Sequence, residues 1–238
     1  SREELRAATE AFRSSPEPAV SREFAAGFEQ AMEGRSLGDA PNELIAAVVA
    51  TGHASTALRM RTGDDSAIEK AIAALASEDA SVEDRCSYLE AFGELGSSQA
   101  RRILIDTLDH GHPKLRSSAL SALRAFPGNN VAQEIVQRLP AWNDETRVIA
   151  ETVLTSRADW VAELLSAVRA GRISAESVSR SAVRRMLLHD QSTIADDVTE
   201  IWGKVDGATT EQMKMQISKT RDILSEGTGN PRTGKALY

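Results

Sequence analysis

Three arginines recur at a constant interval, because Arg85, Arg116 and Arg147 lie 31 residues apart, twice over. Small and apolar residues keep the same interval in two further columns. Those columns are Phe92, Leu123 and Leu154, and Ala91, Ala122 and Val153. Thirty-one residues accommodate two helices of about 12 residues and two turns. The recurrence therefore predicts a series of two-helix repeats rather than a single closed core.

A second apolar stripe follows each of these helices at helical spacing. It comprises Ala100, Leu104 and Leu108, then Val131, Ile135 and Leu139, then Val161, Leu165 and Val168. A fourth unit, beginning near Arg180, is irregular. No segment alternates with the period of two that a strand requires, so we expect no sheet. The predicted fold class is all-α, an α-solenoid of two-helix repeats wound as a right-handed superhelix.

The turn residues indicate four segments along the chain. Residues 1–80 are expected to form a helical region with irregular repeats, and residues 81–204 the regular repeats. Residues 205–226 are expected to contain a polar helix, Thr209 to Ser225, that caps the last repeat. Residues 227–238, rich in Gly, Thr and Pro, read as a linker toward a further domain.

The composition excludes several functional classes. The net charge is −7, which argues against broad binding to nucleic acid or anionic membranes. The single cysteine, Cys86, excludes a disulfide framework and a C-x-x-C-H haem site within these residues. No apolar run reaches the 18 residues of a membrane span. We therefore expect no cofactor in this chain and no membrane span.

The repeat pattern resembles HEAT-type repeats, specifically the short variety that is shared with phycobiliprotein lyases. Arg85, Arg116 and Arg147 match the arginine that such repeats carry early in one helix. The small residues Ala91, Ala119 and Ala122 match their alanine-rich packing. Three copies in phase make this resemblance more specific than one degenerate copy would.

A narrower resemblance covers most of the chain. Residues 24–35, FAAGFEQAMEGR, are similar to the opening of the helical region in large bacterial proteins described as membrane-bound dehydrogenases. Trp202-Gly203 with Thr209-Thr210-Glu211 resembles the closing helices of that region, and residues 227–238 resemble the entry to a cytochrome c domain. The resemblance implies a periplasmic or otherwise extracytoplasmic protein of which this chain is the middle. It also implies a β-propeller before the repeats and haem c in the domain that follows.

Few residues suggest chemistry. His110 and His112 form an H-x-H pair, but Gly111 and Pro113 indicate an exposed inter-repeat turn. Cys86 follows Arg85 on a helix with no histidine, so we interpret it as a core residue. Trp142, Trp160 and Trp202 fall near repeat ends, where core packing is expected. No catalytic residue, metal ligand or cofactor-binding residue is therefore predicted.

Two arginine doublets, Arg101-Arg102 and Arg184-Arg185, are the candidate interaction surface. Arg85, Arg116 and Arg147 are assigned a structural role, pairing with carboxylates or turn carbonyls. The first functional hypothesis is a non-catalytic scaffold or protein-interaction module that spaces a dehydrogenase domain from a cytochrome c domain. Its partners would be proteins or neighbouring domains of the same chain. The alternative is a HEAT-like enzyme that binds nucleic acid or another ligand through an arginine-rich concave face.

Overall fold

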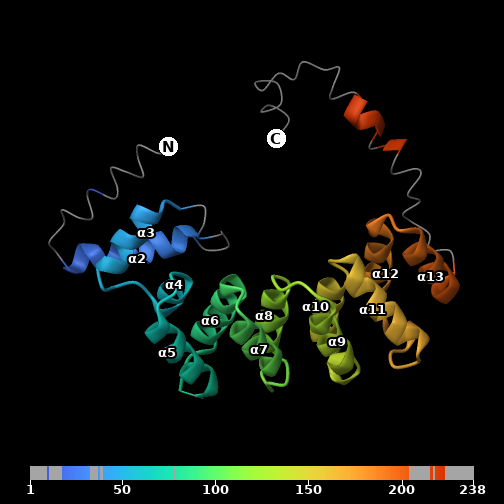
Figure 1. Cartoon of the computed structure of the whole chain (residues 1–238), viewed down its shortest axis with the longest axis horizontal. Coiled ribbons are helices and arrows are strands. Elements are labelled where there is room, and N and C mark those ends of the chain that lie inside the picture. Colours follow the sequence, from blue (N-terminus) through green and yellow to red (C-terminus); the bar gives the residue numbers. More distant parts are fainter. Residues whose placement is uncertain are drawn as a thin grey trace. The chain divides into compact units, whose positions relative to one another are not determined.

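All secondary structure in the described residues is helical, as the sequence predicted, and these residues contain no strand. The computed structural model describes residues 10, 18–32, 37, 40–77, 79–203, 215–216 and 218–222. Two compact units divide the chain, Ser1–Pro127 and Gly128–Tyr238 (Figure 1). This division falls between the two helices of the second predicted repeat, whereas the sequence placed its first domain boundary between residues 80 and 81.

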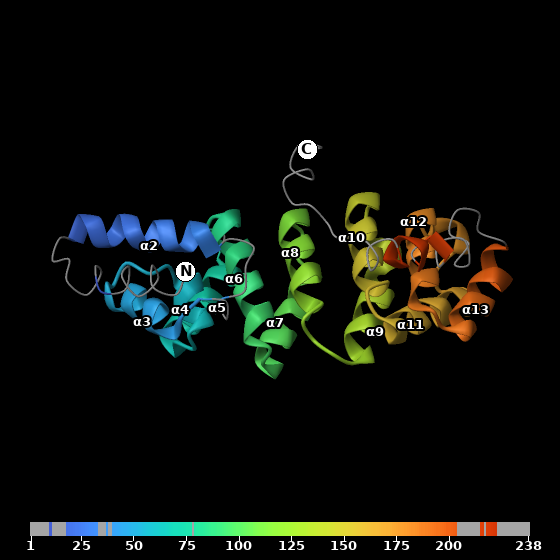
Figure 2. The same ribbon diagram turned by 90° about the horizontal axis from the view of Figure 1, so that it is seen from above.

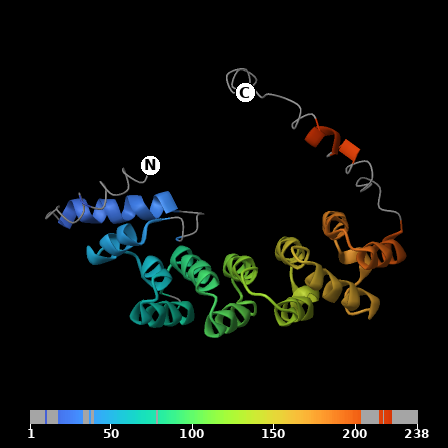
Figure 3. The same cartoon turned by 45° about the horizontal axis from the view of Figure 1, so that its top comes forward.

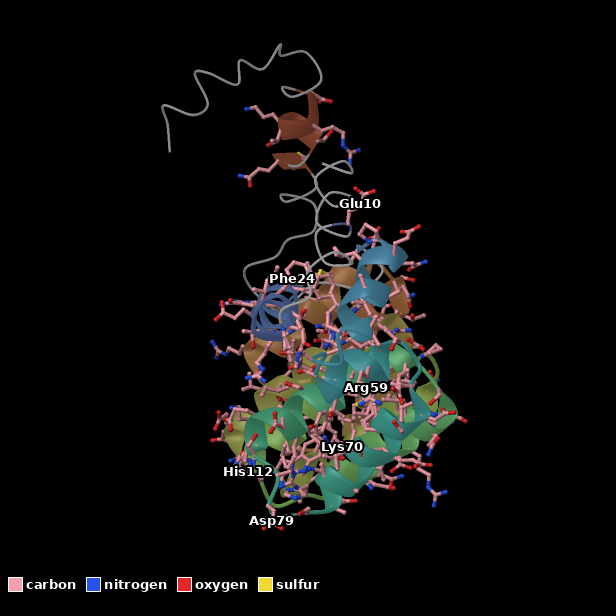
Figure 4. All side chains as sticks on the ribbon, turned by 90° about the vertical axis from the view of Figure 1, so that its left-hand side faces the viewer. Glu10, Phe24, Arg59, Lys70, Asp79 and His112 are labelled. Carbon is pink, nitrogen blue, oxygen red and sulfur yellow. The ribbon has the colours of Figure 1, made fainter. Side chains whose placement is uncertain are left out.

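The first unit opens with a small helical pair. Helix α2 (Pro18–Met32) packs on helix α3 (Asn42–Ala50), and the two run beside one another in Figure 2. Residues Phe24, Phe28 and Met32 recur every fourth position, so they line one face of α2. Their face packs into a local core that also contains Leu44, Ile45, Val48 and Leu58. Figure 4 shows the side chains of this region with Phe24 labelled.

Short helices in hairpins form the rest of the first unit. They are α4 (Thr56–Arg61), α5 (Asp65–Ala76), α6 (Val82–Leu95), α7 (Ser98–Thr107) and α8 (Pro113–Leu123). At each N-cap, a side chain accepts a hydrogen bond from a backbone N–H of the first turn, which has no partner within the helix. The five N-cap residues are Ser55, Asp64, Ser81, Ser97 and His112.

The hairpins of the first unit stack in two rows. Helix α6 packs between α4 and α8, while α5 and α7 form the second row, as Figure 3 shows. Leu89, Phe92, Leu115 and Leu120 are fully buried in this stack. Helices α6 and α8 approach closely because Gly93 carries no side chain where it faces Ala122. Helix α4 packs on α6 just as α6 packs on α8. The hairpin α4–α5 therefore belongs to the stack, and the stacked hairpins begin before Ser81.

The second unit contains the remaining described α-helices before Gly203. They are α9 (Asn129–Arg138), α10 (Asp144–Leu154), α11 (Ala158–Arg169), α12 (Arg180–Met186) and α13 (Ser192–Trp202). Short 3-10 segments η2 (Leu139–Ala141), η3 (Ala175–Ser177) and η4 (Leu187–His189) lie between them. Helix α11 packs between α9 and α13, and α10 packs on α12. These contacts again place consecutive hairpins in two rows.

The C-terminal predictions fall mostly outside the described residues. Within the predicted capping helix, residues 215–216 and 218–222 are helical and exposed. The other residues of that predicted helix, and the predicted linker 227–238, lie outside the described residues. No described helix is long and apolar enough to cross a bilayer.

Candidate functional site: a groove in the first unit

The repeat arginines occupy one equivalent position in their helices. Arg85, Arg116 and Arg147 are each the fourth residue of α6, α8 and α10. Each guanidinium donates to a carbonyl of the chain segment that precedes its helix. The acceptors are Leu75 O at 3.0 Å for Arg85, Leu108 O at 3.2 Å and His110 O at 2.9 Å for Arg116, and Trp142 O at 3.0 Å for Arg147.

Backbone carbonyls of the preceding segment, in a turn or in the last turn of a helix, are thus the partners that the three repeat arginines share. Arg147 also lies 3.3 Å from the Asp144 carboxylate. Carbonyls at helix ends lack intrahelical donors, so an arginine from the next helix satisfies them and joins consecutive elements. Arg59 is likewise the fourth residue of α4, but it pairs forward with Asp64 at 2.6 Å. Its interval to Arg85 is shorter than 31 residues, which is why the sequence pattern did not include it.

The rings of His110 and His112 accept backbone hydrogen bonds within their own turn. The ring Nδ1 of His112 accepts the backbone N–H of Lys114 at 3.3 Å and caps α8. His110 is half-buried rather than exposed, and its Nε2 lies 2.8 Å from Arg85 Nη2. Cys86 is buried, 8% exposed, as expected for a core residue. Among the residues that the structure describes, no group of three or more potential ligands could hold a metal ion.

The arginine doublets fall in different units. Arg101 and Arg102 lie on α7 in the first unit, and Arg184 and Arg185 lie on α12 in the second. Arg102 and Arg184 are exposed, whereas Arg101 and Arg185 are half-buried. Arg185 donates from Nε to Thr155 Oγ1 at 2.9 Å, so part of this doublet is structural.

A buried carboxylate lies beside that contact in the second unit. Glu151 is 1% exposed, and its Oε1 accepts the backbone N–H of Ser179 at 3.1 Å. The hydroxyl of Ser179 donates to the other oxygen of the carboxylate. Since Ser179 is also the N-cap of α12, Glu151 fixes the start of that helix onto α10. A polar bond thus joins the third and fourth hairpins where the repeat sequence becomes irregular.

The tryptophans are mainly core residues, as predicted. Trp160 is fully buried, and its Nε1 donates to Gly128 O at 3.1 Å. Trp142 is 7% exposed. Trp202 is half-buried and donates to Ala175 O at 2.9 Å. None of the three presents the exposed ring that would mark a docking patch.

A groove of about 800 Å³ lies in the first unit between α2, α4 and α6. Phe28, Met32, Leu37 and Leu58 contribute apolar surface to it, and Tyr88 projects from α6. Carboxylates surround this surface: Glu29 from α2, and Asp84, Glu90 and Glu94 from α6. Figure 4 views the molecule from the side on which α2 and α4 lie.

Negative charges outnumber positive ones in the groove. Arg61 is its sole cation among the lining residues, and its Nε bonds Glu94 at 3.0 Å. Glu29 accepts the backbone N–H of Ser55 at 2.8 Å and so holds α2 against the start of α4. Asp84 accepts from the Ser81 hydroxyl at 2.8 Å. Glu90 is exposed and lies on the same helix face as Glu94, four residues on. The groove therefore presents a net negative surface that also includes some apolar side chains.

A second hollow, of about 550 Å³, adjoins the groove. Both are lined by Leu37 and Arg61, so these two residues mark where they meet. The second hollow is mainly apolar, with Ile45, Ala46 and Val49 of α3 in its wall. The two neighbouring hollows differ in character, because carboxylates line the first and mainly apolar side chains line the second.

Two ion pairs outside the groove, Arg59–Asp64 and Lys114–Glu83, shift the pKa values of their members. The Arg59 guanidinium, with Ser66 and the Ala67 backbone, lowers the pKa of Asp64 to about 2. The hydrogen bond from Lys114 Nζ to Glu83, 2.8 Å long, lowers the pKa of Glu83, and the same bond raises the pKa of Lys114. Both pairs link neighbouring helices at the surface, so they contribute modestly to stability.

The sequence did not point to this groove. Three of its acidic residues lie on α6 and the fourth, Glu29, lies on α2, and each alone reads as a solvated charge. The spacing of Glu83, Glu90 and Glu94 on one helix was a weak signal of an acidic face. No protein-family model and no curated protein matches this sequence.

Proposed function

We propose that this chain is a non-catalytic helical-repeat scaffold and protein-interaction module whose hairpins continue as an α-solenoid with a right-handed superhelix. The observation that carries the proposal is the arginine-to-carbonyl bond at the fourth position of α6, α8 and α10. A bond repeated at one helical position is expected of repeats that each contact only their neighbours. The two-row stacking within each unit supports the same architecture.

The proposal extends to a larger parent protein. There the module spaces a propeller-type dehydrogenase domain from a cytochrome c domain, in a periplasmic or otherwise extracytoplasmic location. The support for this context is the resemblance of residues 24–35, of Trp202-Gly203 with residues 209–211, and of residues 227–238 to one bacterial family. The haem would belong to the following domain, and the partners would be neighbouring domains or other proteins.

An arginine-rich binding face has less support. Arg85, Arg116 and Arg147 are engaged with carbonyls of their own chain, and Lys114 pairs with Glu83. The groove between α2, α4 and α6 carries carboxylates, which repel phosphates. We therefore favour the scaffold over a nucleic-acid-binding enzyme.

Small-angle X-ray scattering tests the solenoid. A compact domain of 238 residues has a radius of gyration of about 18 Å. A solenoid of stacked hairpins should give a clearly larger value. It should also show a rod-like intermediate region with a cross-section only two helix layers thick. A globular curve without that region would contradict the proposal.

A further inference from the structure

We propose that the groove between α2, α4 and α6, together with its adjoining hollow, binds a basic amphipathic helix of a partner protein. The inference rests on the proposed role as an interaction module, and it adds the chemistry of the partner. Three observations carry it: the charge of the groove, the apolar surface beside it, and the size of the two hollows.

The acidic end selects a cationic partner. Four carboxylates and one guanidinium line the groove, and that guanidinium is already paired with Glu94. Glu90 is exposed and lines the same groove as Tyr88. A lysine or arginine that enters this groove gains attraction from the carboxylates and contact with an aromatic ring. Phosphate-bearing ligands carry the same sign of charge as these carboxylates and are repelled.

The apolar end selects a partner with an apolar face. Ile45, Ala46 and Val49 of α3 line a hollow of about 550 Å³, and Leu37 continues the apolar surface into the groove. Amphipathic helices bind by placing apolar residues at positions i, i+3, i+4 and i+7 into such grooves. A helix with leucines on one side and lysines along its edge matches both ends at once, whereas a small cation would leave the apolar hollow empty.

Backbone NMR tests the proposal with a defined probe. The probe is an 18-residue helical peptide of leucine and lysine, patterned with one apolar face, added to the isotope-labelled 238-residue chain. We expect chemical-shift changes concentrated at residues around the groove and hollow, including Ala46, Val49, Tyr88 and Glu90. A peptide of the same composition in a scrambled order, and a leucine–glutamate peptide of the same pattern, should leave these signals nearly unchanged.

Matched variants locate the binding surface. Glu90→Lys reverses a groove charge, and Ala46→Gln fills the hollow with a polar side chain. Each should weaken peptide binding by about fivefold. Glu69→Lys and Ala73→Gln make the same changes at exposed positions of α5 that line neither hollow, and they should alter binding less than about twofold.

Three results would overturn the inference. They are shift changes spread over the acidic surfaces of other helices, equal binding of the scrambled peptide, or equal effects of the groove and α5 variants. None of these results bears on the solenoid, because scattering measures the architecture without any ligand. An elongated scattering curve with negative peptide data would therefore reject the basic-helix partner alone.

Discussion

Gly93 of α6 faces Ala122 of α8 so closely that a β-carbon on Gly93 would lie 2.9 Å from the Ala122 Cβ and 3.1 Å from its Cα and carbonyl oxygen. The nearest atoms include backbone, which cannot rotate away as a long side chain can. Glycine in a helix interior is otherwise unfavourable. Its presence at this buried site is therefore explained by the separation of the two helices.

Replacing Gly93 by alanine should destabilise the protein. Higher helix propensity contributes up to about 1 kcal/mol in favour of the variant, but overpacking against the α8 backbone costs about 1–3 kcal/mol. The expected net loss is about 1–2 kcal/mol in urea unfolding. Gly27→Ala is the control, because a Cβ on Gly27 of α2 meets no atom within 4 Å. That variant should be slightly stabilised, and a stabilised Gly93→Ala would contradict the close approach.

Removing Arg85 should cost more than removing an exposed arginine. Arg85 is 7% exposed, and its guanidinium satisfies the Leu75 carbonyl. Arg85→Ala leaves that acceptor without its donor, so we expect a loss of about 1–3 kcal/mol in unfolding free energy. Arg102→Ala on α7 should change stability by less than about 0.5 kcal/mol. Equal losses from the two substitutions would show that the repeat arginine does not stabilise the stack.

Replacing Glu151 should lower the unfolding free energy, because its carboxylate anchors the start of α12. Glu151→Ala removes the acceptor for both the Ser179 amide and its hydroxyl, and we expect a loss of about 1–3 kcal/mol. Glu151→Gln keeps one carbonyl oxygen and should lie between the wild type and the alanine variant. The control is Asp196→Ala on the exposed surface of α13, with less than about 0.5 kcal/mol. Thermal or urea unfolding followed by circular dichroism gives all three values.

The Arg59–Asp64 pair should make protein stability depend on pH in the acid range. The pKa of Asp64 is lowered from 3.8 to about 2, so the folded state binds this proton less tightly than the unfolded chain. Its contribution to stability is therefore present above about pH 4 and is lost as pH falls through about 2. NMR titration of the side-chain carboxyl carbon should give a midpoint near 2. In Arg59→Gln the midpoint should rise toward the ordinary value, and an unchanged midpoint would contradict the assignment of Arg59 as the main cause.

Much of the helical pattern was predictable because each repeat depends on local sequence signals. The 31-residue interval placed the helices that carry Arg85, Arg116 and Arg147, and N-cap residues such as Ser81 marked where they begin. The fourth repeat was harder to recognise. Helix α12 has Ser179 as its N-cap and Val183 as its fourth residue, so its register departs from the 31-residue interval. There Ser179 donates its amide and hydroxyl hydrogens to the Glu151 carboxylate, and this contact takes the place of an arginine contact.

The helical class, the hairpin order and a structural role for the repeat arginines can be read from the order of the amino acids. Tertiary structure alone decided the groove, because Glu29, Arg61 and Glu90 come from three helices and meet only when α2, α4 and α6 pack. It also decided the division at Pro127 and the stacking of α4–α5, which carries no 31-residue signal. Helix periodicity and capping act over a few neighbouring residues, so they can be read from order alone. A groove depends on the distances between helices, which are set by close contacts such as that of Gly93 with Ala122.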